Sequence, residues 1–79
     1  MRKSVYTRAY KELCAQLIAA RHSAGLTQQQ LAHKLGKTQS FVAKFEGGER
    51  RLDVVEFLEI TRVLKVDAKV FLTAVASAL

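Results

Sequence analysis

Three polar side chains in the segment TQSFVAKFE could hydrogen-bond to the edges of nucleic-acid bases. Gln39 carries an amide, Ser40 a hydroxyl and Lys44 an ammonium group. On a helix whose inner face carries Val42 and Phe45, the three polar side chains point outward. An amide matches N6 and N7 of adenine, and an ammonium group matches O6 or N7 of guanine. The pattern predicts base contacts in a major groove, the alternative being a solvated surface helix.

Phe41 lies between the inward and outward faces of this helix. One interpretation is partial burial against the preceding or the following helix. The other is an apolar contact with a thymine methyl group or a sugar edge. Residue type and spacing leave both interpretations open.

Residues at the edges of this segment could bind phosphate. Gln28 begins a preceding helix, where backbone N–H groups and the helix dipole attract an anion. Lys37 lies in the turn before Gln39, and the loop GGERR offers backbone N–H groups and two guanidinium groups. The predicted phosphate contacts are therefore Gln28, Lys37, Gly48, Arg50 and Arg51.

Other kinds of site find little support. His22 and His33 have no cysteines or carboxylates at ligand spacing, so we expect no metal and no other cofactor. No grouping typical of a nucleophile with its base is present, so we expect no catalytic residues and no enzyme. Cys14 is interpreted as a core residue, with a redox switch as the alternative.

The charge distribution agrees with a polyanionic partner. The chain has 79 residues and a net charge of +6. Residues 1–51 hold ten Lys and Arg against three Glu, whereas residues 52–79 hold three against four Asp and Glu. One basic part and one neutral part indicate two different surfaces. The charged N-terminal segment and the lack of a long apolar stretch predict a cytoplasmic protein without a membrane partner.

Five helices are needed to position these residues. Thr27 with Gln30, and Asp53 with Glu56, form capping boxes, while Thr38 and Asp67 are single N-caps. Gly25, Gly36 and the pair Gly47-Gly48 are expected to end helices. The predicted helices cover about 5–24, 28–35, 39–46, 54–65 and 68–79, in a single domain of residues 1–79. The apolar stripe of the first helix contains Tyr6, Tyr10, Leu13, Leu17 and Ala20.

The second and third helices have the composition of a helix-turn-helix. Ala32 is small enough for a close crossing, and Gly36 allows the positive φ of a tight turn. Leu31, Val42 and Phe45 supply the apolar groups between the two helices. We therefore predict an all-α fold with a central helix-turn-helix.

Residues 17–72 resemble the phage-repressor and Cro type of helix-turn-helix domain, also called the XRE type. The matching residues are Arg21, GLTQQQLA (25–32), Gly36, TQSFVAKFE (38–46), GGERRL (47–52) and VLKVDAKVFL (63–72). The resemblance implies a five-helix lambda-repressor-like domain that binds double-stranded DNA. Residues 1–12, an N-terminal extension of the first helix, are not explained by it.

The resemblance also implies roles for single residues. The positions of Gln39, Ser40 and Lys44 are the usual base contacts of the family. The residue at Gln28 binds phosphate and supports the side chain at Gln39. Arg21 and Glu46 form an ion pair between the first and third helices, so we expect the loss of Arg21 to lower stability first.

A homodimer is expected, because one short recognition helix contacts too few base pairs to select a genomic site. The C-terminal helix offers an apolar face for the interface, formed by Phe71, Leu72, Val75, Ala76 and Leu79. Burial of this face in the domain's own core is the alternative, and the stripe around Tyr6 and Tyr10 is a second possible interface.

The predicted function is sequence-specific recognition of a short inverted repeat by a repressor-like transcriptional regulator. A phage Cro-like repressor, a restriction–modification controller and the antitoxin of a toxin–antitoxin pair all resemble this chain. We expect a bacterial or phage-encoded protein, associated with the nucleoid when bound and without a small-molecule ligand. A protein-interaction adaptor, with a toxin or another protein as partner, and a non-specific nucleic-acid binder are the competing functions.

Overall fold

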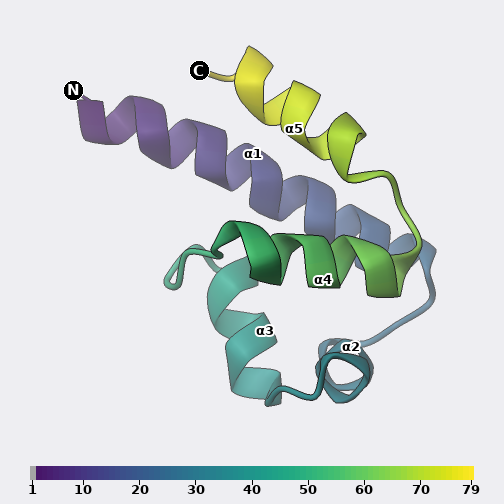
Figure 1. The fold of residues 1–79 in the computed structure, drawn as a ribbon. Helices are drawn as coiled ribbons and strands as arrows, with labels where there is room; N and C mark the ends of the chain where they lie inside the picture. Colours follow the sequence, from purple (N-terminus) through teal and green to yellow (C-terminus); the bar gives the residue numbers. More distant parts are fainter. Residues whose placement is uncertain (1) are drawn as a thin grey trace.

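The computed structural model describes the backbone of residues 2–79 and the side chains of residues 8–79. Within these residues the chain forms only helices, as predicted (Figure 1). They are α1 (Arg2–Ser23), α2 (Gln28–Leu35), α3 (Gln39–Glu46), α4 (Val54–Leu64) and α5 (Ala68–Ser77). α1 begins earlier than expected, because no proline or glycine interrupts residues 2–5.

The capping residues begin the helices that they were predicted to begin. The Thr27 hydroxyl accepts from the Gln30 backbone N–H, and the Gln30 side chain accepts from the Thr27 N–H. Asp53 and Glu56 make the same reciprocal pair of hydrogen bonds at the start of α4. Each box satisfies two backbone donors that the first turn of a helix leaves without partners. Single caps begin the other two helices, at Thr38 and Asp67.

Residues with positive φ lie at the ends of α1, α2 and α4, and the one at the end of α4 is not a glycine, whereas α3 and α5 end at right-handed residues. Gly36 (φ 69°) ends α2 and turns the chain directly toward α3. At the end of α4, however, the left-handed position is occupied by Lys65 (φ 59°). A Cβ atom makes this conformation costly, so the turn is maintained by the packing on both sides of it.

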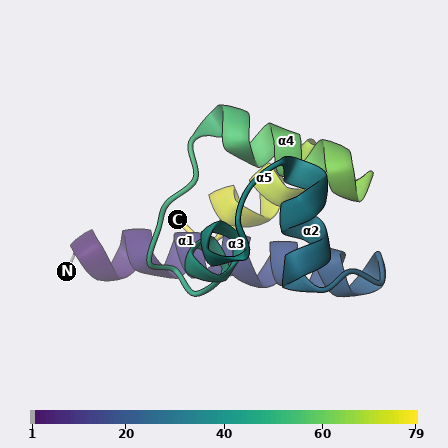
Figure 2. The ribbon, with the colours of Figure 1, turned by 90° about the horizontal axis from the view of Figure 1, so that it is seen from below.

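The core lies where α1, α2, α3 and α4 meet, with one residue from α5. It contains Leu17, Leu31, Ala32, Val42, Phe45, Phe57, Ile60, Leu64 and Phe71. α5 lies along α1 and runs antiparallel to it, at the opposite end of the molecule from the turn between α2 and α3 (Figure 1). Seen from below, α2 and α3 form the nearest part of the molecule, with α3 almost end-on (Figure 2). The amino-terminal end of α3 therefore projects away from α1, α4 and α5.

The apolar face predicted for α5 needs one correction. Phe71 is 6% exposed and packs edge-on against Phe57, with 6.1 Å between ring centroids, so it belongs to the domain's own core. Leu72 and Leu79 remain well exposed, Ala76 is exposed, and Val75 is half-buried. The Tyr6 side chain, part of the second possible interface, lies outside the described residues. No helix in the described part of the chain has the length and apolarity needed to cross a membrane.

Candidate nucleic-acid interface

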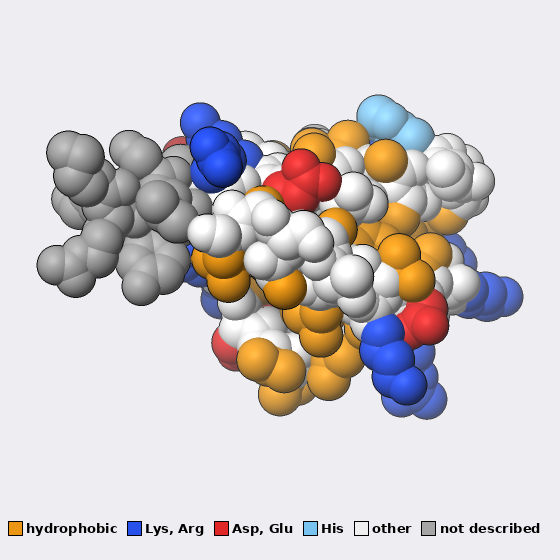
Figure 3. Space-filling view, turned by 90° about the horizontal axis from the view of Figure 1, so that it is seen from above, with side chains coloured by type: hydrophobic (Ala, Val, Ile, Leu, Met, Phe, Trp, Pro, Cys, Tyr) orange, Lys and Arg blue, Asp and Glu red, His pale blue; other side chains and the backbone are white. Residues whose placement is uncertain are grey.

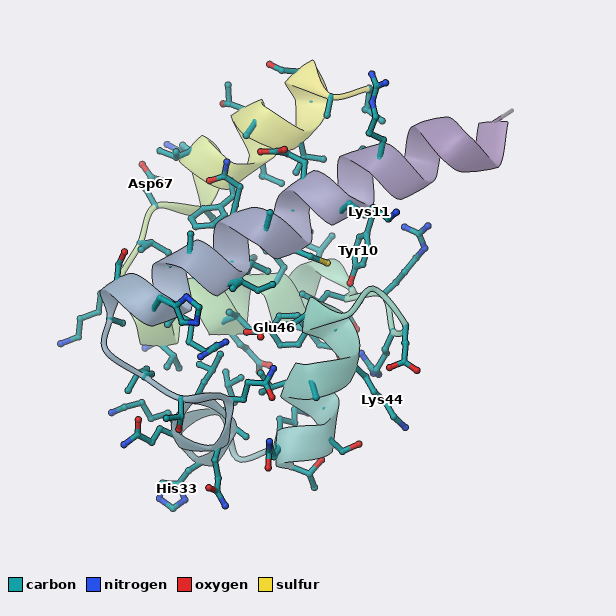
Figure 4. The ribbon with its side chains drawn as sticks, turned by 180° about the vertical axis from the view of Figure 1, so that it is seen from behind. Tyr10, Lys11, His33, Lys44, Glu46 and Asp67 are labelled. Carbon is teal, nitrogen blue, oxygen red and sulfur yellow. The ribbon has the colours of Figure 1, made fainter. Side chains whose placement is uncertain are left out.

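α3 has one buried face and one face open to a partner. Val42 and Phe45 are 0% exposed, whereas Gln39, Ser40 and Lys44 are exposed on the outside. Burial of each large apolar side chain contributes about 1.5–3 kcal/mol, which holds the helix firmly against the core. Lys44 extends away from the protein (Figure 4). The polar face of α3 is therefore accessible on a rigid support.

A continuous chain of hydrogen bonds runs from α1 to the first exposed residue of α3. The Arg21 guanidinium donates to both carboxylate oxygens of Glu46, at 2.7 and 3.0 Å, and to the Leu26 carbonyl. Gln28 donates its amide N–H to the same carboxylate at 2.9 Å. Gln39 then donates to the Gln28 amide oxygen at 3.4 Å. The ion pair between Arg21 and Glu46 is thus present, and it is almost completely buried.

The order of donors and acceptors in this chain determines how the Gln39 amide is turned. The Glu46 carboxylate can only accept, so Gln28 must point its NH₂ group inward and its oxygen toward Gln39. Gln39 in turn points its NH₂ group toward Gln28. Its second amide N–H and its oxygen remain for an outside partner. One donor beside one acceptor is the arrangement that pairs with N7 and N6 of adenine.

Phe41 is half-buried beside two cations. Its ring packs edge-on against Phe45, with 5.6 Å between centroids. The Arg50 guanidinium carbon lies 4.9 Å from the Phe41 centroid, and the Lys37 Nζ atom lies 5.5 Å from it. Phe41 therefore packs against the core and also attracts two positive groups to its ring.

The loop after α3 removes one of the predicted phosphate contacts and gives another a partner within the protein. The Gly48 backbone N–H donates to the Phe45 carbonyl at 3.1 Å, so it is already used within the protein. Gly48 is instead required for its conformation, with φ at +81°. Arg50 donates to both Glu56 oxygens, at 3.0 and 2.9 Å, and to the Arg51 carbonyl. A phosphate would have to compete with Glu56 for Arg50, which joins the loop to the first turn of α4.

The pairing of Arg50 with Glu56 changes the acidity of the carboxyl group. The hydrogen bond from Arg50 lowers the pKa of Glu56, and the backbone N–H of Asp53 lowers it further. Glu56 therefore stays ionised at pH values where an ordinary glutamate begins to take up a proton. From the sequence, Glu56 was expected only in its capping box, because it follows Arg50 across an irregular segment with no helical spacing.

The other predicted phosphate contacts keep accessible groups. Lys37 and Arg51 are exposed, and no carboxylate among residues 8–79 forms an ion pair with either of them. Gln28 lies in the first turn of α2, where the backbone N–H groups have no acceptor within the helix. Gln28, Lys37 and Arg51 therefore remain able to bind phosphate oxygens.

Sequence reasoning missed the role of two residues of α1. The Tyr10 hydroxyl donates to the Arg50 carbonyl at 2.8 Å, and the Arg51 guanidinium lies over the Tyr10 ring, 4.8 Å from its centroid. The Cys14 thiol donates to the Phe45 carbonyl at 3.1 Å. Burial raises the pKa of the Cys14 thiol, which favours the neutral, unreactive form expected of a core residue. These contacts join residues 31 to 41 positions apart, for which a local pattern gives no signal.

The comparisons with known proteins agree with this geometry. The sequence matches the helix-turn-helix family over residues 17–71. An XRE-family like protein from Pseudomonas syringae pv. tomato str. DC3000, of solved structure, is 41% identical to this chain and has a TM-score of 0.88. The match covers 96% of this chain and 93% of that one. No curated protein matches the sequence. The chain therefore belongs to the XRE family of helix-turn-helix proteins, a family of DNA-binding regulators.

Proposed function

We propose that this protein is a repressor-like transcriptional regulator that binds a short inverted repeat in double-stranded DNA as a homodimer. α3 enters the major groove with its amino-terminal end first. Gln39, Ser40 and Lys44 contact base edges, and Phe41, which is only half-buried, meets a thymine methyl group. In this proposal the protein acts in the cytoplasm of a bacterium, on the nucleoid or on phage DNA.

The observation that carries this proposal is the supported amide of Gln39. An exposed glutamine normally samples several rotamers, and fixing one for recognition costs entropy. Here the chain through Gln28 and Glu46 to Arg21 favours one orientation of the amide before DNA binds, although its last hydrogen bond is long, at 3.4 Å. A preferred orientation of an amide at the tip of an exposed helix contributes little to folding. It has value for discriminating one base from another.

Phosphate contacts would set the position of α3 in the groove. Gln28, Lys37 and Arg51 lie at the edges of the helix-turn-helix, and a dimer would present each of them twice. If a dimer makes about six to eight such contacts, log K should fall with log salt concentration at a slope of roughly −5 to −7. Binding that does not respond to salt would contradict this mode of binding.

The dimer is proposed to form through the face opposite the end of α3. Exposed apolar side chains gather there, over α4 and α5 (Figure 3). We propose that Leu72, Val75, Ala76 and Leu79 of α5 form the contact, without Phe71. Two copies joined in this way would have to place their α3 helices about 34 Å apart, one turn of the duplex.

Selection of binding sites from a pool of random duplexes tests the proposed function directly. The full chain should enrich one short motif that is repeated in inverted orientation with a fixed spacing. Enrichment of a single half-site would contradict the dimer but keep sequence-specific binding. Recovery of no motif at all would refute sequence-specific regulation and leave non-specific nucleic-acid binding or an adaptor role.

A second candidate is supported by a separate observation. Val54, Val55 and Leu58 are exposed in the first half of α4. This second group of exposed apolar side chains would bind a protein partner, as in an antitoxin or an adaptor. Lysine in place of Val55 should leave the homodimer intact and abolish binding of such a partner. The antitoxin proposal fails if the product of the neighbouring gene does not bind this protein.

A further inference from the structure

Tyr10 lies outside the matched family segment and nevertheless contacts the loop that follows α3. Its side chain points from α1 toward this loop (Figure 4). The hydroxyl donates to the Arg50 carbonyl at 2.8 Å, and the ring lies under the Arg51 guanidinium at 4.8 Å. The Tyr10 side chain thus contacts both the backbone of Arg50 and the side chain of Arg51.

α1 holds the end of α3 at a second point, one turn further along. The Cys14 thiol donates to the Phe45 carbonyl, on the same face of α1 as Tyr10. The loop itself is tight, because the backbone N–H groups of Glu49 and Arg50 both donate to the Lys44 carbonyl. The position of the loop relative to α3 therefore depends on α1 as well as on the loop's own hydrogen bonds.

The two arginines of the loop differ in which guanidinium N–H groups remain available to a phosphate. Arg50 is bound to Glu56 through both of its terminal nitrogens. Arg51 has no carboxylate partner among residues 8–79 and is held only through the face of its guanidinium. Stacking on an aromatic ring uses the flat face and leaves the N–H groups at the edge free. Those edge groups are the ones that bind a phosphate in a fork.

We propose that Tyr10 is a positioning residue for DNA binding, which holds the Arg51 guanidinium in place for a phosphate of the strand beside α3. Tyr10 thereby becomes part of the interface without itself contacting DNA. This inference rests on the proposed function. It extends that function by assigning a role to a segment that the family resemblance leaves unexplained.

The test combines two substitutions with the selected duplex as the probe. Tyr10→Leu removes the ring, and Arg51→Gln removes the charge. Tyr10→Leu should weaken binding about tenfold, because each of two protomers loses a stacking interaction worth a factor of about three. Arg51→Gln should weaken binding at least as much and make the salt slope shallower by about 2, since a dimer loses two phosphate contacts.

The double variant distinguishes positioning from a structural role. If Tyr10 acts through Arg51, the double variant binds as weakly as Arg51→Gln alone. Losses that multiply, or a Tyr10→Leu protein that is folded and binds normally, would overturn the inference. Arg62→Gln, an exposed charge near the far end of α4, is the control and should leave the salt slope unchanged. Tyr10→Phe keeps the ring and should keep most of the affinity.

A measurement on the unmodified protein covers the case in which Tyr10→Leu does not fold. The Arg51 side-chain protons should show an upfield ring-current shift in NMR spectra, and this shift should persist in the DNA complex. Its loss on binding DNA would overturn the inference. If the unmodified protein selects no DNA motif, the proposed function fails. If it selects a motif but shows no coupling between Tyr10 and Arg51, only the present inference fails.

Discussion

At the scale of single residues, a buried ion pair helps to orient one exposed amide. A buried ion pair seldom adds much net stability, because desolvation of both charges offsets their attraction. The pair between Arg21 and Glu46 has a further consequence, since its carboxylate also sets the orientation of Gln28 and through it that of Gln39. The ion pair thus links the fold to the chemistry of recognition.

Gln39→Ala should reduce discrimination more than affinity. We expect binding to the selected duplex to fall about 10- to 100-fold, the value of about 1–3 kcal/mol for one bidentate base contact. Binding to unrelated duplexes should hardly change, because the phosphate contacts remain. Competitive titration with duplexes altered at one base pair measures both quantities. Gln29→Ala, a neighbouring exposed amide on α2, is the matched control, and an equal loss there would contradict the role of Gln39.

The phenol of Tyr10 should lose its proton at a higher pH than an ordinary tyrosine does. Burial, followed by the nearby Cys14, raises the pKa of Tyr10 to about 12 from an ordinary value of 10.0. The folded state therefore holds this proton more tightly than the unfolded state does. Its contribution to stability is complete below pH 10 and disappears as the pH rises toward 12.

Ultraviolet titration of the phenol, with Tyr10→Phe as the reference protein, measures this pKa. Unfolding of the two proteins between pH 9 and pH 12 measures the linked stability. Tyr10→Phe should lose less stability over this range than the unmodified protein. Equal losses would show that Tyr10 has the same pKa in both states.

At the scale of elements, capping residues and glycines explain most helix boundaries, whereas the end of α4 depends on packing. Lys65 occupies a left-handed position that a sequence pattern would give to glycine. Lys65→Gly should stabilise the protein by about 0.5–1 kcal/mol through relief of this strain. Chemical denaturation measures the change, and Lys65→Ala, which keeps the Cβ atom, should not stabilise. A destabilised Lys65→Gly protein would show that the lysine side chain contributes more than its backbone costs.

The connection between α1 and α3 should be the element contact most sensitive to mutation. Arg21→Ala leaves the Glu46 carboxylate buried without its partner and should cost about 3–5 kcal/mol of unfolding free energy. Urea denaturation measures this loss. Lys34→Ala, an exposed cation of α2, should cost little. At temperatures where Arg21→Ala stays folded, its preferred DNA motif should be unchanged or only broadened, and selection of a different motif would contradict a supporting role.

At the scale of the whole molecule, the chain separates two kinds of surface. The amino-terminal end of α3 lies at one end of the molecule, and the exposed apolar side chains of α4 and α5 lie toward the other (Figures 1 and 3). A regulator that joins two copies and places both on one duplex needs this separation. The same surface could not bind a polyanion and a second apolar chain together.

Leu72→Lys should prevent dimer formation. Leu72 is 53% exposed on α5, so the substitution should leave the monomer folded while placing two like charges in the interface. Light scattering at tens of micromolar should show a dimer for the unmodified protein and a monomer for the variant. Ala19→Lys, on an exposed part of α1, is the control. An unmodified protein that is monomeric at this concentration would refute the proposed homodimer.

The local features of this fold could be predicted from the sequence. Helix starts at Thr27, Thr38, Asp53 and Asp67, and the turn at Gly36, depend on groups within a few residues of one another. The division of α3 into a buried and an exposed face follows from its period of 3.6 residues. The family resemblance added the pairing of Arg21 with Glu46, which spacing alone does not indicate.

The tertiary structure determines which of several possible partners each side chain contacts. Arg50 and Arg51 are identical in type and adjacent in sequence, but Glu56 engages one and the Tyr10 ring holds the other. Phe71 could have faced a second chain, yet it fills a space in the core beside Phe57. Residue type and spacing limit the interactions that a side chain can make. Only the folded chain determines which partner is near enough to make them.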